Sequence, residues 1–131
     1  MAFAPSSLIL ANNFLPVNRA LCVFEISMNS EKFVSLLKSE LDNSFELYAS
    51  KDSYIGSKLD SLELSPENKG EVLALVKEAV TENLYVLLCA LEGSSSLAGN
   101  QQIYTVSDEN NSTVSGELDS EFYMQVIEAS V

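Results

Sequence analysis

The chain contains no histidine, no tryptophan and only two cysteines among its 131 residues. Without histidine it lacks the commonest general base, the base of the usual serine and cysteine triads, and most zinc ligand sets. Cys22 and Cys89 do not make a disulfide framework, and Cys89 lies in an apolar run where a cysteine packs as a small hydrophobe. These absences favour a non-catalytic protein without cofactor or metal. A reducing, cytoplasmic location is the simpler expectation.

Basic side chains are also scarce, with 7 lysines and arginines against 19 aspartates and glutamates and a formal net charge of -12. A charge of this sign repels nucleic-acid phosphate and anionic membrane surfaces, and it attracts basic partners at moderate ionic strength. The densest apolar run, Leu84 to Leu91, is far shorter than the roughly 20 residues of a membrane span. We therefore expect neither direct nucleic-acid binding nor insertion into a membrane.

The acidic residues are unevenly placed along the chain. Residues 31–77 hold nine acids and six lysines, whereas residues 78–131 hold nine acids and no base. The nine acids of the second stretch are Glu78, Glu82, Glu92, Asp108, Glu109, Glu117, Asp119, Glu121 and Glu128. Such a run either solvates an exposed face or forms a docking surface for a basic protein.

Apolar residues make up 47% of the chain and charged residues 20%, which is typical of one globular domain of this length. We assign that domain to residues 28–131. Residues 1–27 carry apolar clusters interrupted by Pro16 and only one base, Arg19, so they do not fit a secretory signal. They are either an arm that packs on the domain or sequence upstream of a natural start at Met28.

Two amphipathic helices are predicted in the first part of the domain. Apolar residues recur at spacings of three and four over residues 31–48, after a serine at position 30 that suits an N-cap. A second helix begins at Ser65-Pro66 and runs about 27 residues to a stop at Gly93, with a break near residues 81–83 left open. Residues 49–65 form a connection or a short helical turn.

The C-terminal part of the sequence changes its periodicity. β-Forming residues at 103–106 and at 113–114 flank the turn residues 108–111, which predicts a small two-stranded hairpin. A last helix is expected from residues 115–117 onward. The predicted fold class is therefore α+β and mostly α, with three to four helices around a buried central helix. Leu84 to Leu91, apolar nearly all round, would be its most buried segment.

The same turn has the spacing of a calcium-binding loop, but not its glycine. Asp108, Asn110 and Ser112 match positions 1, 3 and 5, and Asp119 matches position 12. Position 6 is Thr113, where the loop needs glycine, and a strand instead of a helix is expected before it. A polar hairpin turn explains these residues as well, so we predict no metal site.

The most suggestive segment for partner binding is Gly93 to Gln102 with Tyr104. It combines small residues, two adjacent glutamines and an aromatic ring beside the acidic stretch, although the glutamines would serve equally well to cap a turn. The predicted partner-binding residues are Glu92, Gln101, Gln102, Tyr104, Asp108, Glu109, Glu117, Asp119 and Glu121.

Three segments carry a family resemblance: Leu88 to Ser96, Gln101 to Tyr104, and Gly116 to Leu118. Over roughly residues 84–123 the chain resembles small uncharacterised bacterial domains, some of which are immunity proteins that neutralise a toxin. The resemblance implies a cytoplasmic inhibitor without chemistry of its own. Without a defining motif, it assigns no role to any single residue.

The sequence thus favours a non-catalytic acidic protein that docks a basic macromolecular partner, including a nucleic-acid mimic within the same class. One alternative is a structural subunit that forms homo-oligomers through the apolar residues 1–27. Another is an enzyme that uses carboxylates, alone or with a divalent ion.

Overall fold

The computed structural model describes residues 27–131. The arm predicted over residues 1–27 lies almost entirely outside the described residues. The described part is helical, and its elements in chain order are α2 (Ser30–Tyr48), α3 (Tyr54–Ser61), α4 (Pro66–Leu91), α5 (Leu118–Phe122), the π-helical turn η2 (Tyr123–Ile127) and the 3-10 turn η3 (Glu128–Ser130).

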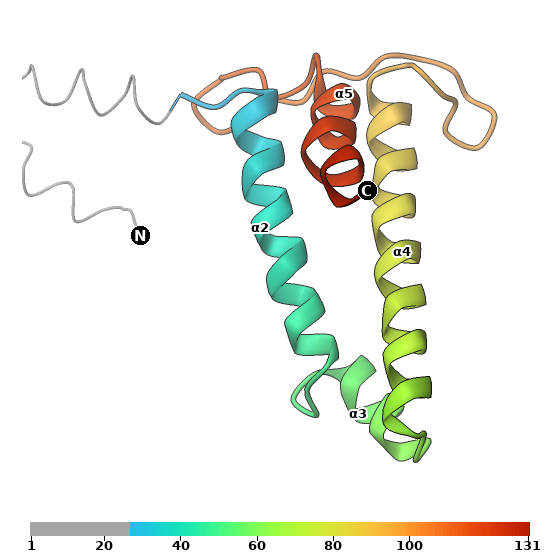
Figure 1. The fold of residues 1–131 in the computed structure, drawn as a ribbon. Helices are drawn as coiled ribbons and strands as arrows, with labels where there is room; N and C mark the ends of the chain where they lie inside the picture. Colours follow the sequence, from blue (N-terminus) through green and yellow to red (C-terminus); the bar gives the residue numbers. More distant parts are fainter. Residues whose placement is uncertain (1–26) are drawn as a thin grey trace, which may run out of the picture.

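Two long helices and a shorter C-terminal one form the body of the molecule (Figure 1). Helices α2 and α4 run side by side, and the continuous turns of α5, η2 and η3 lie between them at one end, in contact with both. The segment between α4 and α5 crosses that same end, which we call the polar end. Helix α3 lies beside α2 at the opposite end, which we call the open end.

Helix α2 confirms the prediction for residues 31–48, with a different cap. The Asn29 side chain, not that of Ser30, accepts a hydrogen bond from the Lys32 amide at 2.8 Å. Asparagine and serine are comparable N-caps, and the Ser30 hydroxyl is occupied elsewhere: it donates to the Val114 carbonyl at 2.6 Å. Because the Ser30 hydroxyl bonds to Val114, 84 residues away in sequence, Asn29 caps the helix instead.

Helix α4 begins as predicted and runs unbroken for 26 residues. The Ser65 hydroxyl accepts from the Asn68 amide at 3.1 Å, and Pro66 occupies the first turn, where its missing N–H is harmless. After the helix ends, Gly93 takes a positive φ of 81°. The break considered near residues 81–83 is absent from this helix.

The connection over residues 49–65 contains the eight-residue helix α3. The Ser53 hydroxyl caps it by accepting from the Gly56 amide at 2.8 Å. A Cβ on Gly56 would overlap the carbonyl oxygen of Ser50, so only glycine allows α3 to pack this close to the end of α2.

The apolar core lies at the polar end and in the middle of the molecule. Its most buried side chains are Phe122 and Val34, both 0% exposed, and Leu118 at 1%. The remaining members of the buried cluster are Leu41, Leu88 and Val114. On α4, every residue that packs against this cluster lies at or after Val80, which leaves the first half of the helix outside the core.

The predicted two-stranded hairpin is wrong. Within residues 27–131 there is no strand, and only an isolated bridge joins Ser107 to Thr113. The Val106 carbonyl accepts from the Val114 amide at 2.7 Å, but the Val106 amide donates to the Ser115 hydroxyl at 2.9 Å. A side chain thus takes the place of the next backbone partner, and the ladder stops after one step.

The expectation that Leu84 to Leu91 is the most buried segment is also wrong in part. Leu88 and Ala90 are buried, but Val86 is 52% exposed and Leu87 is 43% exposed. Within residues 27–131, the helical elements that pack against α4 are α5 and η2, which cover one of its sides. None of these residues fully covers its apolar outer side.

Candidate docking surfaces

All nine predicted partner-binding residues lie between the last turn of α4 and the end of α5. This segment forms the polar end of the molecule (Figure 1), so the structure gathers them into one region. Their side chains differ in what they do there. Several are engaged in hydrogen bonds that hold the polar end together, and others face solvent.

Glu92 is a structural residue of the polar end. One of its carboxylate oxygens accepts from the backbone amides of Gly116, at 2.7 Å, and Leu118, at 2.8 Å. Glu117, which precedes α5, makes no side-chain cap to the helix. The carboxylate of Glu92 therefore satisfies the first amide of α5, that of Leu118, and the Gly116 amide just before the helix, at a helix end that favours negative charge.

Asp119 and Gln101 also bind other parts of this segment. The Ser94 hydroxyl donates to the Asp119 carboxylate at 2.8 Å, which ties the end of α4 to α5. The Gln101 side-chain amide donates to the Gly93 carbonyl at 2.5 Å. Gln101 thus caps the turn after α4, which was one of its two predicted roles.

Asp108 organises the turn that resembled a calcium loop. One of its oxygens accepts from the amides of Asn110, at 2.9 Å, and Ser112, at 2.8 Å. Two hydrogen bonds from backbone amides satisfy this oxygen in the geometry of an Asx turn. Asp119 instead points to Ser94, so the two carboxylates of the considered loop serve different contacts.

The remaining candidates are more accessible. Glu109, Glu117 and Gln102 are exposed, and their side chains make no hydrogen bond or ion pair within the described part of the chain. Glu121 is half-buried and accepts from the Gln125 side chain at 2.9 Å. Tyr104 is half-buried, and its backbone amide donates to the Leu91 carbonyl. Glu109 and Glu117 are thus the two carboxylates of this set that are free to meet a partner.

Sequence reasoning missed the hydroxyl at the centre of the polar end. Ser30 is only 8% exposed; its hydroxyl donates to the Val114 carbonyl and accepts from the Glu117 amide at 3.0 Å. One side chain therefore joins the start of α2 to the segment before α5. A serine at a helix start has the same sequence signature as an N-cap, so no local pattern distinguishes this role.

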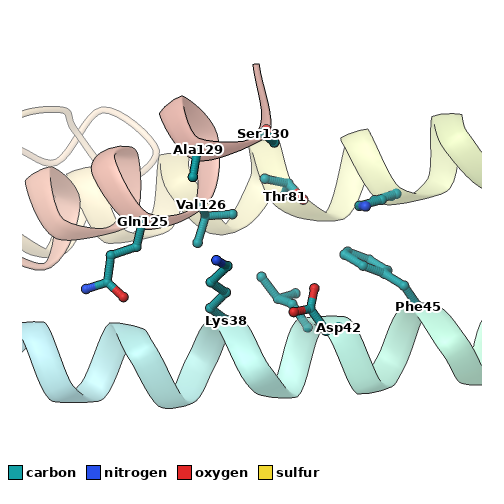
Figure 2. Close-up of a pocket in the computed structure, with 10 residues that line it drawn as sticks. Lys38, Asp42, Phe45, Thr81, Gln125, Val126, Ala129 and Ser130 are labelled. Atoms are coloured by element: carbon teal, nitrogen blue, oxygen red, sulfur yellow. The ribbon is translucent and has the colours of Figure 1, made fainter.

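A cavity of about 120 Å³ is lined by α2, α4 and the C-terminal turns. Figure 2 shows Lys38 extending from α2 toward Val126 of the C-terminal turns, while Asp42 lies farther along α2, between Lys38 and Phe45. The Lys77 ammonium completes the wall from α4, 5.4 Å from the centre of the Phe45 ring. Two lysines, one aspartate and an aromatic ring line this cavity, together with the hydroxyls of Thr81 and Ser130. Neither hydroxyl is hydrogen-bonded to a lysine or to the aspartate, and that of Ser130 donates to the Ile127 carbonyl at 2.9 Å, so this lining holds no nucleophile paired with a base.

A wider hollow of about 590 Å³ follows on the other side of Lys77. Glu78, Glu82 and Tyr85 of α4 line it, opposite Ile127 of the C-terminal turns. A side-chain hydrogen bond with Cys89, and then desolvation, raise the pKa of the Tyr85 phenol above its ordinary value of 10.0. Tyr85 is therefore protonated at neutral pH, and the charged side chains that line this hollow are Glu78, Glu82 and Lys77.

The described residues contain no metal-binding cluster of three or more acidic or cysteine side chains. Every buried side-chain nitrogen and oxygen among residues 27–131 has a hydrogen-bond partner, so none of these atoms needs a ligand to satisfy it. None of the described helices is long and apolar enough to cross a membrane.

The comparisons with known proteins give no match. No protein-family model matches the chain, and neither a curated protein nor a solved structure is significantly similar to it.

Proposed function

We propose that this chain is a non-catalytic acidic protein that docks a basic protein partner in the cytoplasm, in the manner of an immunity-type inhibitor. The observation that carries the proposal is the uncompensated charge after Lys77. Within the part of the chain that the structure describes, none of the nine later carboxylates forms an ion pair, and the ion pair found there joins Lys51 to Asp60 at the open end.

Uncompensated surface charge is electrostatically unfavourable for the isolated molecule, and a partner of opposite charge relieves it. Complementary charges raise the rate of association and suppress wrong partners more than they add raw affinity. The free carboxylates Glu109 and Glu117 lie on the same end of the molecule as Glu92 and Asp119, whose hydrogen bonds keep the surface in one conformation. A surface held in one conformation loses less entropy when it binds.

The cytoplasmic part of the proposal is supported by the cysteine content, because two cysteines make no disulfide framework of the kind found in secreted domains. The non-catalytic part is supported by the chemistry of the cavities. Their walls combine lysines, carboxylates and aromatic rings without a paired nucleophile and base.

The test is a pull-down from lysate of the native host with the tagged full-length chain, eluted by a salt gradient and analysed by mass spectrometry. We expect one dominant basic protein that is released as ionic strength rises, because surface charges are screened beyond about 10 Å at 0.1 M salt. Replacing Glu109 and Glu117 by glutamine should reduce its recovery. No basic protein retained at low salt would overturn the proposal.

A matched control separates a docking surface from general charge. Glu40 and Glu46 are exposed on α2, and converting both to glutamine changes the net charge by the same two units. The proposal expects these substitutions to leave recovery of the partner close to that of the wild type. An equal loss of partner recovery in both double variants would mean that the partner responds to the net charge of the protein and not to a surface at the polar end.

A further inference from the structure

The outer side of α4 carries an apolar stripe that no described residue covers completely. Val72, Leu75, Ala79 and Val86 follow one another at spacings of three, four and seven, which places them within about 60° of arc at roughly 100° per residue. Leu75 is 66% exposed and Val86 is 52% exposed. We call these four residues the outer stripe.

The outer stripe continues at the polar end of the molecule. A Cβ on Gly93 would lie 2.5 Å from the Ile103 side chain, which shows that Ile103 rests against the turn at the end of α4. Ile103 is itself 74% exposed, and Leu87, at 43%, lies on the flank of the stripe. Contiguous exposed apolar side chains of this kind mark interaction surfaces in soluble proteins.

A row of glutamates runs along one edge of the outer stripe. Glu67, Glu71, Glu78 and Glu82 are spaced by four, seven and four residues, and all four are exposed. Like charges four residues apart destabilise a helix by a few tenths of a kcal/mol in isolated peptides. We call these four the acidic row. The acidic row contains two such pairs, Glu67 with Glu71 and Glu78 with Glu82, and no lysine lies between the members of the row on this edge.

The spacing of the outer stripe is that of a helix–helix seam. Val72, Leu75, Ala79 and Val86 match successive a, d, a and a positions of a heptad pattern, and Glu82 occupies the d position between Ala79 and Val86. A carboxylate within an apolar seam favours a partner with a lysine or arginine opposite it, because an unpaired charge is costly to desolvate.

We propose that a basic amphipathic helix of a partner protein docks along the outer stripe, with its apolar face on Leu75 and Val86 and its basic side chains on the acidic row. This inference rests on the proposed function and adds to the polar end a second docking surface, on α4. Glu78, Glu82 and Lys77 line the hollow beside Tyr85. A lysine or arginine of the partner would meet two carboxylates and an aromatic ring there, against one ammonium of this chain.

Charge favours a basic partner helix on the outer stripe over a second copy of this chain and over the segment 1–26. A second copy of the chain carries the same net charge of -12 and would bring two acidic rows together. The segment 1–26 contains one base, Arg19, and one acid, Glu25, so it offers no net positive charge to the row. A basic helix is the occupant that satisfies both the apolar stripe and its acidic edge.

The experiment measures fluorescence anisotropy of two labelled synthetic peptides with the full-length chain. The first peptide, about 18 residues long, is built from leucine and lysine with the leucines at heptad spacing, so that as a helix it would span the stripe. The second has the same composition in an order that gives no apolar face. We expect the first peptide to bind at least about tenfold more tightly than the second.

Variants locate the binding surface. Replacing Leu75 and Val86 by asparagine should weaken the first peptide by on the order of tenfold, while the same change at Leu36 and Leu47, which are 60% and 52% exposed on α2, should have no effect. Glu78→Gln with Glu82→Gln should weaken binding at low salt, and this loss should shrink as ionic strength rises. All six positions are exposed, and unchanged circular dichroism and melting temperature would show that the variants fold.

The outcomes separate this inference from the function beneath it. If both peptides bind equally well and the Leu75/Val86 variant binds like the wild type, the helix-docking surface is overturned, while a basic partner remains. If neither basic peptide binds at low salt, the charge-driven function is contradicted as well. A wild-type dimer that becomes monomeric in the Leu75/Val86 variant, seen by sedimentation, would overturn the inference in favour of self-association.

Discussion

The two ends of the molecule use similar amino acids in different ways. At the polar end, the side chains of Ser30, Glu92 and Asp119 join segments that are 24 to 87 residues apart in sequence. At the open end, the side-chain hydrogen bonds of Ser50, Ser53 and Ser61 reach only two or three residues along the chain.

Burial follows the same division. The buried cluster around Phe122 joins α2, α4 and α5 at the polar end and the middle of the molecule, whereas the first half of α4 contributes nothing to it. The long-range side-chain hydrogen bonds therefore coincide with the buried cluster, whereas the open end buries the single apolar side chain of Leu59, 5% exposed, on α3 outside that cluster. This difference predicts that the polar end sets the stability of the fold and leaves the outer side of α4 available for binding.

The largest expected effect tests the core of the polar end. Phe122→Ala should lower the free energy of unfolding by about 3–5 kcal/mol, because Phe122 is 0% exposed and its removal leaves a cavity. Urea denaturation followed by circular dichroism measures this loss. Tyr123→Ala is the matched control, because Tyr123 is the next residue and its side chain is 46% exposed. This variant should lose much less free energy of unfolding. Equal losses would contradict the difference in burial.

A smaller effect is expected from the hydrogen bonds of the polar end. Glu92→Ala should destabilise the protein by about 1–3 kcal/mol, because the amides of Gly116 and Leu118 lose a charged acceptor. Glu109→Ala removes a carboxylate from the same end without breaking such a bond and should change stability by less than about 0.5 kcal/mol. Thermal unfolding of both variants measures the difference. Equal melting temperatures would show that Glu92 is not structural.

The smallest expected effect concerns Tyr85, which lies beside the hollow on α4. The hydrogen bond with Cys89 raises the pKa of Tyr85, so its contribution to the free energy of unfolding is complete below about pH 10 and falls as pH rises through the raised pKa. Tyr85→Phe should therefore make the melting temperature less sensitive to pH between about 9 and 11.

Tyr54→Phe provides the control for this titration, because the Tyr54 side chain is 76% exposed at the open end. It should keep the pH dependence of the wild type. Phenolate absorbance should also show one late-titrating tyrosine that disappears in Tyr85→Phe and persists in Tyr54→Phe. Parallel melting curves for wild type and Tyr85→Phe would contradict the assigned shift.

Local signals in the sequence were sufficient for the long helices. The spacing of apolar residues and the pair Ser65-Pro66 gave α2 and α4 with nearly the observed bounds, because caps and periodicity act within a few residues. The hairpin failed for the opposite reason. β-Forming residues at 103–106 need a partner strand, and the Ser115 side chain takes the bond that a ladder requires.

Burial and site roles were the least predictable from sequence. An apolar run such as Leu84 to Leu91 does not say which sides of a helix will be covered, and the structure leaves Val86 and Leu87 exposed. Among the predicted partner-binding residues, Glu92 and Glu109 carry the same side chain. One binds two amides and the other faces solvent, a difference that depends on which segment folds over each of them.

The sequence by itself determined the charge, its concentration after Lys77, and the start and end of each long helix, because these depend on composition and on neighbours along the chain. Only the tertiary structure decided which carboxylates hold the fold and which remain free. It also decided that, among residues 27–131, one apolar side of α4 stays uncovered. Both outcomes depend on contacts between segments far apart in sequence, where burial and hydrogen bonding are set by packing.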